Sequence, residues 1–268
     1  MTENKTRLWV GVGAYVLIGA GMAVSDGGDG IFAPATAHEK HAEGGEGGEG
    51  GEGGEAGYTN ADPDLVFAVN LLLTRGHLHI ANELAAIKDW EHASAHAQHP
   101  AAETYDQIAP ELKARGAAPF EGELNALVQQ IAEETPGAPF DAAYGAVIAK
   151  IDAAYARIEA SKRATPGFTM QAILALLKQA GAEYTIGVSQ GKIVNLQEYQ
   201  DANGFIGVAD QLAATIDKSL PGMADIVAQL KQLKTAWSPT AGMGGMVTPE
   251  AGILAAISRI ELKAGGVK

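Results

Sequence analysis

The sequence predicts an all-α protein: an antiparallel helical bundle of about eight helices in two four-helix halves. One N-terminal transmembrane helix and a disordered tether rich in glycine and glutamate are expected to precede it. Three observations support the bundle. Apolar residues recur at helical spacing, no strand-like alternation of comparable length competes, and proline and glycine divide the body at short intervals.

Residues 1–24 have the pattern of a membrane anchor or a signal sequence. Lys5 and Arg7 precede an apolar run from Leu8 to Val24, and positive residues favour the cytoplasmic side of a membrane. The small-residue site at 35–37 lies farther beyond this run than signal cleavage usually tolerates. We therefore expect an uncleaved single-pass anchor in a bacterial inner membrane, with the body in the periplasm. A cleaved signal sequence is the alternative.

Residues 25–57 form a low-complexity tether with a Gly-Gly-Glu repeat. Its glutamates are Glu43, Glu46, Glu49, Glu52 and Glu55. A chain of this composition buries no core and behaves as a flexible coil, which mutual repulsion of the glutamates extends. His38 and His41 flank Glu39 at its start, and we interpret them as part of a solvated tether rather than as a metal site.

The body divides into a histidine-rich half at 58–163 and a second half at 166–268. The shift that superimposes Val69 on Ile173 also superimposes Ile80 on Tyr184, which preserves the helical register. Helix breaks are expected at the proline- and glycine-containing sites between and within the halves, including Pro100. The alternative to an internal repeat is a bundle of unrelated helices.

Composition excludes several classes of function. The net charge of −13 and the lack of any long basic run argue against nucleic-acid binding. With no cysteine, the chain forms no disulfide, iron–sulfur centre or Cys-x-x-Cys-His haem attachment, so a metal would be held by histidine, aspartate, glutamate or tyrosine. No nucleophile motif and no phosphate-binding glycine loop beside a strand is present, so we do not expect an enzyme.

All seven histidines lie between residues 38 and 99, and most of them fall in one short stretch. That stretch contains His77, His79, His92, His96 and His99, together with Glu83, Glu91 and Glu103. Imidazole nitrogens and carboxylate oxygens are the ligands that suit zinc, iron and copper. The cluster therefore predicts a metal site, with iron favoured and zinc or copper as alternatives.

The first helix of the body carries His79 and Glu83 one turn apart. Leu73 and Ile80 belong to its buried stripe, with Glu83 close to the centre of that stripe and His79 at its edge. A glutamate so placed is costly unless it is paired or coordinated. His77, two residues from His79, is expected to point elsewhere.

The next helix carries His92 and His96 one turn apart, on a face that His99 also shares. Antiparallel packing of the two helices would bring four donors together. The predicted metal site consists of His79, Glu83, His92 and His96. His99 precedes Pro100 and is expected at a surface helix end. The alternative is that the histidines are structural and hydrogen-bonded at a packing boundary.

The second half offers carboxylates at the corresponding place, because Glu183 occupies the register of His79 in the repeat. Glu198 and Asp201 lie one turn apart on the helix that follows Asn195. Glu183, Glu198 and Asp201 form a possible second metal site with the hard oxygen donors that favour iron. Favourable interaction of Glu198 and Asp201 with the helix dipole is the alternative explanation.

The second half also shows a family resemblance. It contains Ala182-Glu183-Tyr184, Gly191-Lys192-Ile193-Val194-Asn195, Glu198-Tyr199-Gln200 and Phe205. This pattern resembles the extracytoplasmic helical region of some bacterial oxidase-dependent iron permeases, over roughly residues 170–235. The resemblance implies a role in iron uptake with a permease as partner. The chain lacks that family's Arg-Glu-x-x-Glu motifs, so it is not the permease itself.

A weaker likeness is to the imelysin-type periplasmic iron-uptake proteins, which are helical duplications with a Gly-x-His-x-x-Glu motif. The stretch Gly76-His77-Leu78-His79-Ile80-Ala81-Asn82-Glu83 has those residue types without that spacing. The metal position of that family is therefore not transferred to this chain.

The sequence thus favours a membrane-anchored, extracytoplasmic metal-binding protein that is accessory to the uptake or handling of iron or another divalent metal. A membrane protein or complex, such as an iron permease, is the expected partner. Two alternatives stay open. The chain is a non-catalytic helical accessory subunit that docks on a larger membrane complex and has structural histidines, or it is a bundle that holds b-type haem between two histidines on facing helices.

Overall fold

The computed structural model describes residues 62–237 and 241–267. The predicted anchor at 1–24, the tether at 25–57 and the histidines at 38 and 41 lie outside the described residues. No helix within the described ranges is long and apolar enough to cross a membrane.

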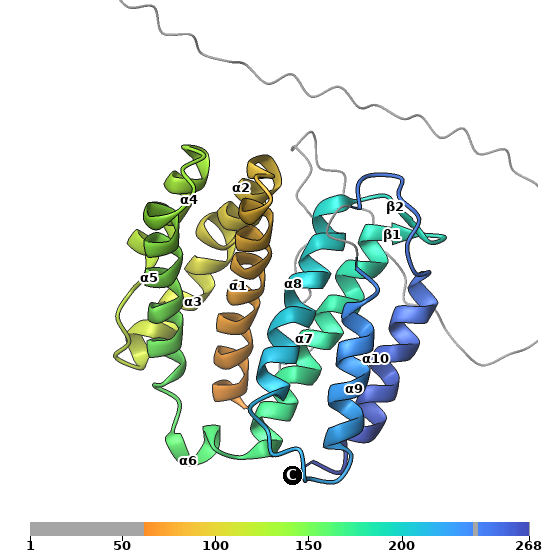
Figure 1. Ribbon diagram of the computed structural model, residues 1–268. Coiled ribbons are helices and arrows are strands. Elements are labelled where there is room, and N and C mark those ends of the chain that lie inside the picture. Colours follow the sequence, from red (N-terminus) through yellow and green to blue (C-terminus); the bar gives the residue numbers. More distant parts are fainter. Residues whose placement is uncertain (1–61, 238–240, 268) are drawn as a thin grey trace, which may run out of the picture. The chain divides into compact units, whose positions relative to one another are not determined.

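The described chain is built almost entirely of helices, as predicted (Figure 1). The α-helices are α1 (Pro63–Ala86), α2 (Trp90–His99), α3 (Tyr105–Ala114), α4 (Glu121–Ala132), α5 (Ala138–Tyr155), α6 (Ala160–Arg163), α7 (Pro166–Gly187), α8 (Leu196–Ala213), α9 (Met223–Lys234) and α10 (Glu250–Ala264). A π-helical turn, η1 (Pro100–Thr104), joins α2 to α3. The count exceeds the predicted eight because α6 is a single short turn and because η1 separates α2 from α3.

Helix α1 lies between two groups of helices, with α2 to α5 on one side and α7 and α8 on the other (Figure 1). Its start is fixed by the Asp62 side chain, which accepts a hydrogen bond from the Asp64 amide, and by proline in the first turn. Because α1 packs on both sides, most of its residues are buried. Leu71 and Leu78 are as fully buried as Ile80, which lies on the predicted stripe.

Pro100 does not end a helix. The Tyr105 amide donates to the Pro100 carbonyl oxygen, five residues back, so the chain continues through one π-helical turn into α3. Proline lacks an N–H donor and crowds the carbonyl of the preceding turn, and the wider π turn accommodates it within a continuous helical segment. The predicted break at Pro100 is therefore wrong.

Two glycines let α1 and α8 cross at close range. A β-carbon on Gly204 would lie 2.4 Å from the Gly76 carbonyl oxygen, and a β-carbon on Gly76 would lie 2.4 Å from the Phe205 ring. Any larger side chain here would force the helices apart. The crossing brings the residue after Gly76, His77, close to Asp201, one turn before Phe205.

Helices α7 to α10 form a group of four. A short hairpin that the sequence did not predict connects α7 to α8. Strand β1 (Val188–Ser189) pairs antiparallel with β2 (Lys192–Ile193). Gln190 and Gly191 form the turn, both with positive φ, which suits a tight two-residue hairpin. The Glu250 carboxylate accepts hydrogen bonds from both turn amides and so attaches α10 to the hairpin.

Candidate metal centre

Two histidines meet one aspartate in the core, where α1, α2 and α8 come together. Nδ1 of His77 lies 2.6 Å from Oδ1 of Asp201, and Nδ1 of His96 lies 2.8 Å from the same oxygen. All three residues are buried, with at most 3% of any of them exposed. Their potential ligand atoms lie within 4.8 Å of one another. In the described part of the chain, these are the side chains that form a group of at least three potential metal ligands.

The two histidines stabilise the ionised form of Asp201. Burial alone would raise the pKa of Asp201, but the charge and hydrogen bond of His77, together with those of His96, overcome that effect and hold the pKa well below its ordinary value. Asp201 is therefore ionised and accepts from both rings. A buried carboxylate is tolerated here because two donors satisfy it.

His96 is held on both sides. Its Nδ1 faces Asp201, and its Nε2 lies 2.9 Å from Oε1 of Gln200. The Asp201 carboxylate accepts from Nδ1, and the Gln200 amide pairs with Nε2, so both ring nitrogens of His96 have a partner within the protein. A metal ion bound by either nitrogen would take the place of the proton there.

The predicted carboxylate set lies beside this group. Burial and then the hydrogen bond and charge of Glu198 raise the pKa of Glu183 to about 8, with a further contribution from the charge of Asp201. The Gln179 amide donates to Glu183 and acts in the opposite direction. At neutral pH Glu183 thus holds a proton in a hydrogen bond with Glu198. Glu183 therefore interacts electrostatically with both Glu198 and Asp201, the other two residues of the predicted second site.

The four residues of the first predicted site are not brought together. Nε2 of His79 lies 3.4 Å from Oε1 of Glu83, whose side chain is half exposed. His92 instead contacts Asp89, the N-cap of its own helix, at 2.8 Å. Burial lowers the pKa of His79, and Glu83 partly counters this. Of the four, the structure places His96 alone in the buried group of the described residues.

His77 occupies the buried position that was predicted for His79. At 100° per residue, His77 lies near the middle of the broad buried arc of α1, whereas His79 and Glu83 lie on the side that is partly or fully exposed. A helical-wheel projection that assumes one buried stripe does not predict the burial of His77, because α1 packs on two sides. His99 is also not at an exposed helix end: its ring centroid lies 4.6 Å from that of His77.

A small cavity of about 50 Å³ lies next to Gln200. Gln200, which contacts His96, forms part of its wall, and Glu83 and Asn203 are among the other lining residues. Such a volume is enough for water. Most of the other lining residues are apolar, and none of His77, His96 and Asp201 lines the cavity.

Comparison with known families agrees with the resemblance seen in the sequence. Residues 159–264 match the model of the family described as iron permease-associated 4-helix bundle domain. The matched region contains α7 to α10 and therefore Asp201, Gln200 and Glu183, whereas His77 and His96 precede it. The predicted relation to the helical region of iron permeases is confirmed for this part of the chain. Searches of curated proteins and of solved structures gave no match.

Proposed function

We propose that this protein is an extracytoplasmic accessory of iron uptake that binds a divalent metal ion at His77, His96 and Asp201. The convergence of two imidazoles on one buried carboxylate carries the proposal. Two histidines and one carboxylate are the donor set of non-haem Fe(II) sites, which favours iron, although imidazole also suits zinc and copper. The match of 159–264 to a domain associated with iron permeases supports a role connected to iron uptake.

The donors fit a metal ion in chemistry and in mutual distance. Their ligand atoms lie within 4.8 Å of one another, so small rotations of the three side chains would direct them at a common point. Binding would replace protons that His77 and His96 now share with Asp201. Gln200 supplies a further oxygen beside His96, and Glu183 with Glu198 adds negative charge nearby.

The placement of the protein follows from its first sixty residues. The apolar run at 8–24 with Lys5 and Arg7 before it favours a single-pass anchor, and the tether at 25–57 would let the helical body reach a neighbouring membrane protein. An iron permease is the partner that the family match favours. In this arrangement the body takes up the ion outside the cytoplasm and hands it to the permease.

One observation favours a second candidate function. Nδ1 of His77 and both nitrogens of His96 already have hydrogen-bond partners within the protein. A satisfied buried network rigidifies a core without any ligand. On this view the chain is a non-catalytic helical accessory subunit that docks on a membrane complex, and its histidines hold α1 and α2 against α8.

Elemental analysis of the full chain, purified without added metal and then reloaded with Fe(II) under anaerobic conditions, separates the two. We expect about one ion per chain, and loss of that ion in Asp201→Asn and His96→Gln. The control variants are Glu83→Gln and His92→Gln, at two residues of the first predicted site that lie outside the buried group. Both variants should retain the bound ion.

Thermal unfolding gives an independent readout, because a ligand that binds the folded state raises the melting temperature. Fe(II) should stabilise the wild-type chain and both control variants but not Asp201→Asn. A metal-free wild-type chain, or equal metal content in Asp201→Asn and wild type, would instead support the structural role of the histidines.

A further inference from the structure

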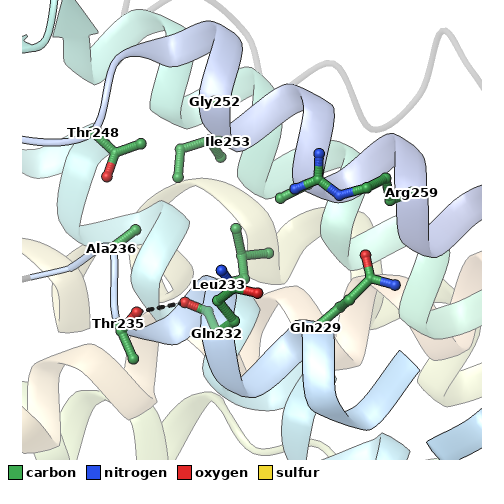
Figure 2. A pocket seen from close by; sticks show the side chains of 10 residues that line it. Gln229, Gln232, Leu233, Thr235, Ala236, Thr248, Gly252, Ile253 and Arg259 are labelled. Carbon is green, nitrogen blue, oxygen red and sulfur yellow. Dashed lines mark hydrogen bonds between the residues drawn. The ribbon is translucent and has the colours of Figure 1, made fainter. Parts of the chain in front are cut away.

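A larger cavity lies between α9 and α10, and none of its lining residues belongs to the candidate metal centre (Figure 2). Its volume is about 210 Å³, and it is open on one side. The lining residues are Gln229, Gln232, Leu233, Thr235 and Ala236 on and after α9, and Thr248, Gly252, Ile253, Ala256 and Arg259 on and before α10. At roughly 30 Å³ per water molecule, this volume suits a small organic molecule.

One wall carries a buried hydrogen-bonding atom that lacks a partner. Oε1 of Gln229 is inaccessible to water and accepts no hydrogen bond within the described residues. Leaving a buried acceptor unsatisfied is costly, and such atoms are few in folded proteins. Gln229 is directed into the space between the two helices (Figure 2). A rotation of the Gln229 side chain would expose this acceptor to a ligand in the cavity that carries a donor.

The opposite wall carries a positive charge. Arg259, an exposed residue of α10, lines the same cavity (Figure 2), and its guanidinium forms no ion pair with any described residue. None of the described residues that line the cavity is an aspartate or a glutamate. In a chain of net charge −13 this is a local cationic site, and a guanidinium matches a carboxylate in shape and in charge.

From these features we propose that the cavity binds a small hydroxycarboxylate. Its carboxylate would pair with Arg259, and its hydroxyl would donate to Oε1 of Gln229. Leu233 and Ile253 provide apolar surface for the carbon skeleton. A hydroxyl is favoured over an ammonium as the donor, because the charge of Arg259 would repel an ammonium and no lining carboxylate offsets it. This site is independent of metal binding at His77, His96 and Asp201.

Calorimetric titration of the full, metal-free chain with citrate and with tricarballylate tests the proposal. The two acids differ by the hydroxyl of citrate. We expect citrate to bind at least about fivefold more tightly than tricarballylate, which is the effect of one hydrogen bond to a buried acceptor. Metal-free protein is needed because citrate itself chelates metal ions.

Two variants assign the contacts. Gln229→Leu should remove the preference for citrate over tricarballylate, and Arg259→Gln should weaken both acids by about tenfold or more. Arg157→Gln, an exposed arginine outside the cavity, serves as the matched control and should bind like wild type. Circular dichroism verifies that each variant is folded.

Three results would overturn the proposal: no citrate binding at millimolar concentration, equal binding of the two acids by wild type, or undiminished binding by a folded Arg259→Gln variant. Failure of the metal proposal leaves this experiment unaffected, because the chain is tested without metal. Conversely, loss of citrate binding in Arg259→Gln should leave the metal content of the protein unchanged.

Discussion

Asp201 is the residue on which the buried group depends. One of its oxygens accepts from both His77 and His96, which come from different helices. Removing one member of a buried charged network leaves the others without compensation, and this is far more costly than removing an exposed ion pair.

We therefore expect Asp201→Asn to lower the free energy of unfolding by about 3 kcal/mol. Urea unfolding of the metal-free chain measures this. Asp225→Asn is the matched control, because Asp225 is exposed and its ion pair with Lys263 joins α9 to α10 at the surface. That variant should lose about 1 kcal/mol or less. Equal losses in the two variants would show that the buried group does not stabilise the fold.

Glu183 predicts a dependence of stability on pH. Its pKa is raised from 4.5 to about 8 in the folded protein, mainly by burial and then by Glu198. Between these values the folded chain binds a proton that the unfolded chain releases. The free energy of unfolding must then fall as pH rises through this window.

Replacing Glu183 with glutamine should remove this dependence, because glutamine stays neutral at every pH. Urea unfolding at pH 5, 6, 7 and 8 should show a shallower decline for Glu183→Gln than for wild type, and greater stability than wild type at pH 8. Glu261→Gln, at an exposed position on α10, is the control and should follow wild type. A wild-type curve that is flat or rises from pH 5 to 8 would contradict the assignment.

The residue types in the sequence indicated a metal site, but they did not identify all of its residues. His96, Glu183 and Asp201 were singled out from residue type and helical spacing. His77 was set aside, because its direction depends on whether α1 packs on one side or on two, and that is a property of the assembled protein. For the same reason, the sequence did not predict that the histidines of the first half contact Asp201 of the second half.

Among the helices, the crossing of α1 and α8 positions the candidate metal centre. Gly76 and Gly204 allow the two backbones to approach closely, so a methyl group at Gly204 would meet the Gly76 carbonyl oxygen. The helices can relieve this only by moving apart, and packed interiors resist such movement.

Gly204→Ala should therefore lower the free energy of unfolding by about 2 kcal/mol, within the range for overpacked cores. It should also weaken metal binding, because separation of α1 from α8 moves His77 away from Asp201. Gly145→Ala is the control: Gly145 lies inside α5, nothing would meet its β-carbon, and alanine should stabilise that helix slightly. Both effects can be read from urea unfolding and metal titration. A Gly204→Ala variant with full stability would show that the crossing tolerates a side chain.

The spacing of apolar residues predicted the presence of the helices well, but it predicted the ends of the helices less accurately. The group α7 to α10 agrees with the four helices expected in the second half. The Val188–Ile193 hairpin was missed because each strand has two residues, too few for an alternating pattern. The turn at Pro100 was misjudged because proline usually ends a helix, and a π turn is the exception.

Across the whole described body, α1 connects the two sequence halves. It packs against α2, α3 and α5 and also against α7 and α8, so the buried group draws His77 and His96 from one half and Asp201 from the other (Figure 1). The halves are therefore not expected to behave as independent domains, although they are separable in the sequence.

Cutting the chain between the halves tests this. A protease site inserted at 156–159, between α5 and α6, lies in a largely exposed connection. After cleavage the two fragments should elute together in size-exclusion chromatography, because the packing of α1 on α7 and α8 survives the cut. They should also retain any metal bound by the intact chain. Separation of the fragments in native buffer would show that the halves fold and persist alone.

The π-helical turn at Pro100–Thr104 has a consequence for the alignment of the helices on either side of it. One extra residue in a helix rotates everything beyond it by about 100°. That rotation lets His96 in α2 and Ile108 in α3 face the same interior. Deleting one residue within 100–104 would restore a regular helix but would set these two side chains in conflict, since either His96 or Ile108 would have to turn toward solvent. The π-helical turn thus sets the rotation of α3 relative to α2, so that both buried side chains can point inward.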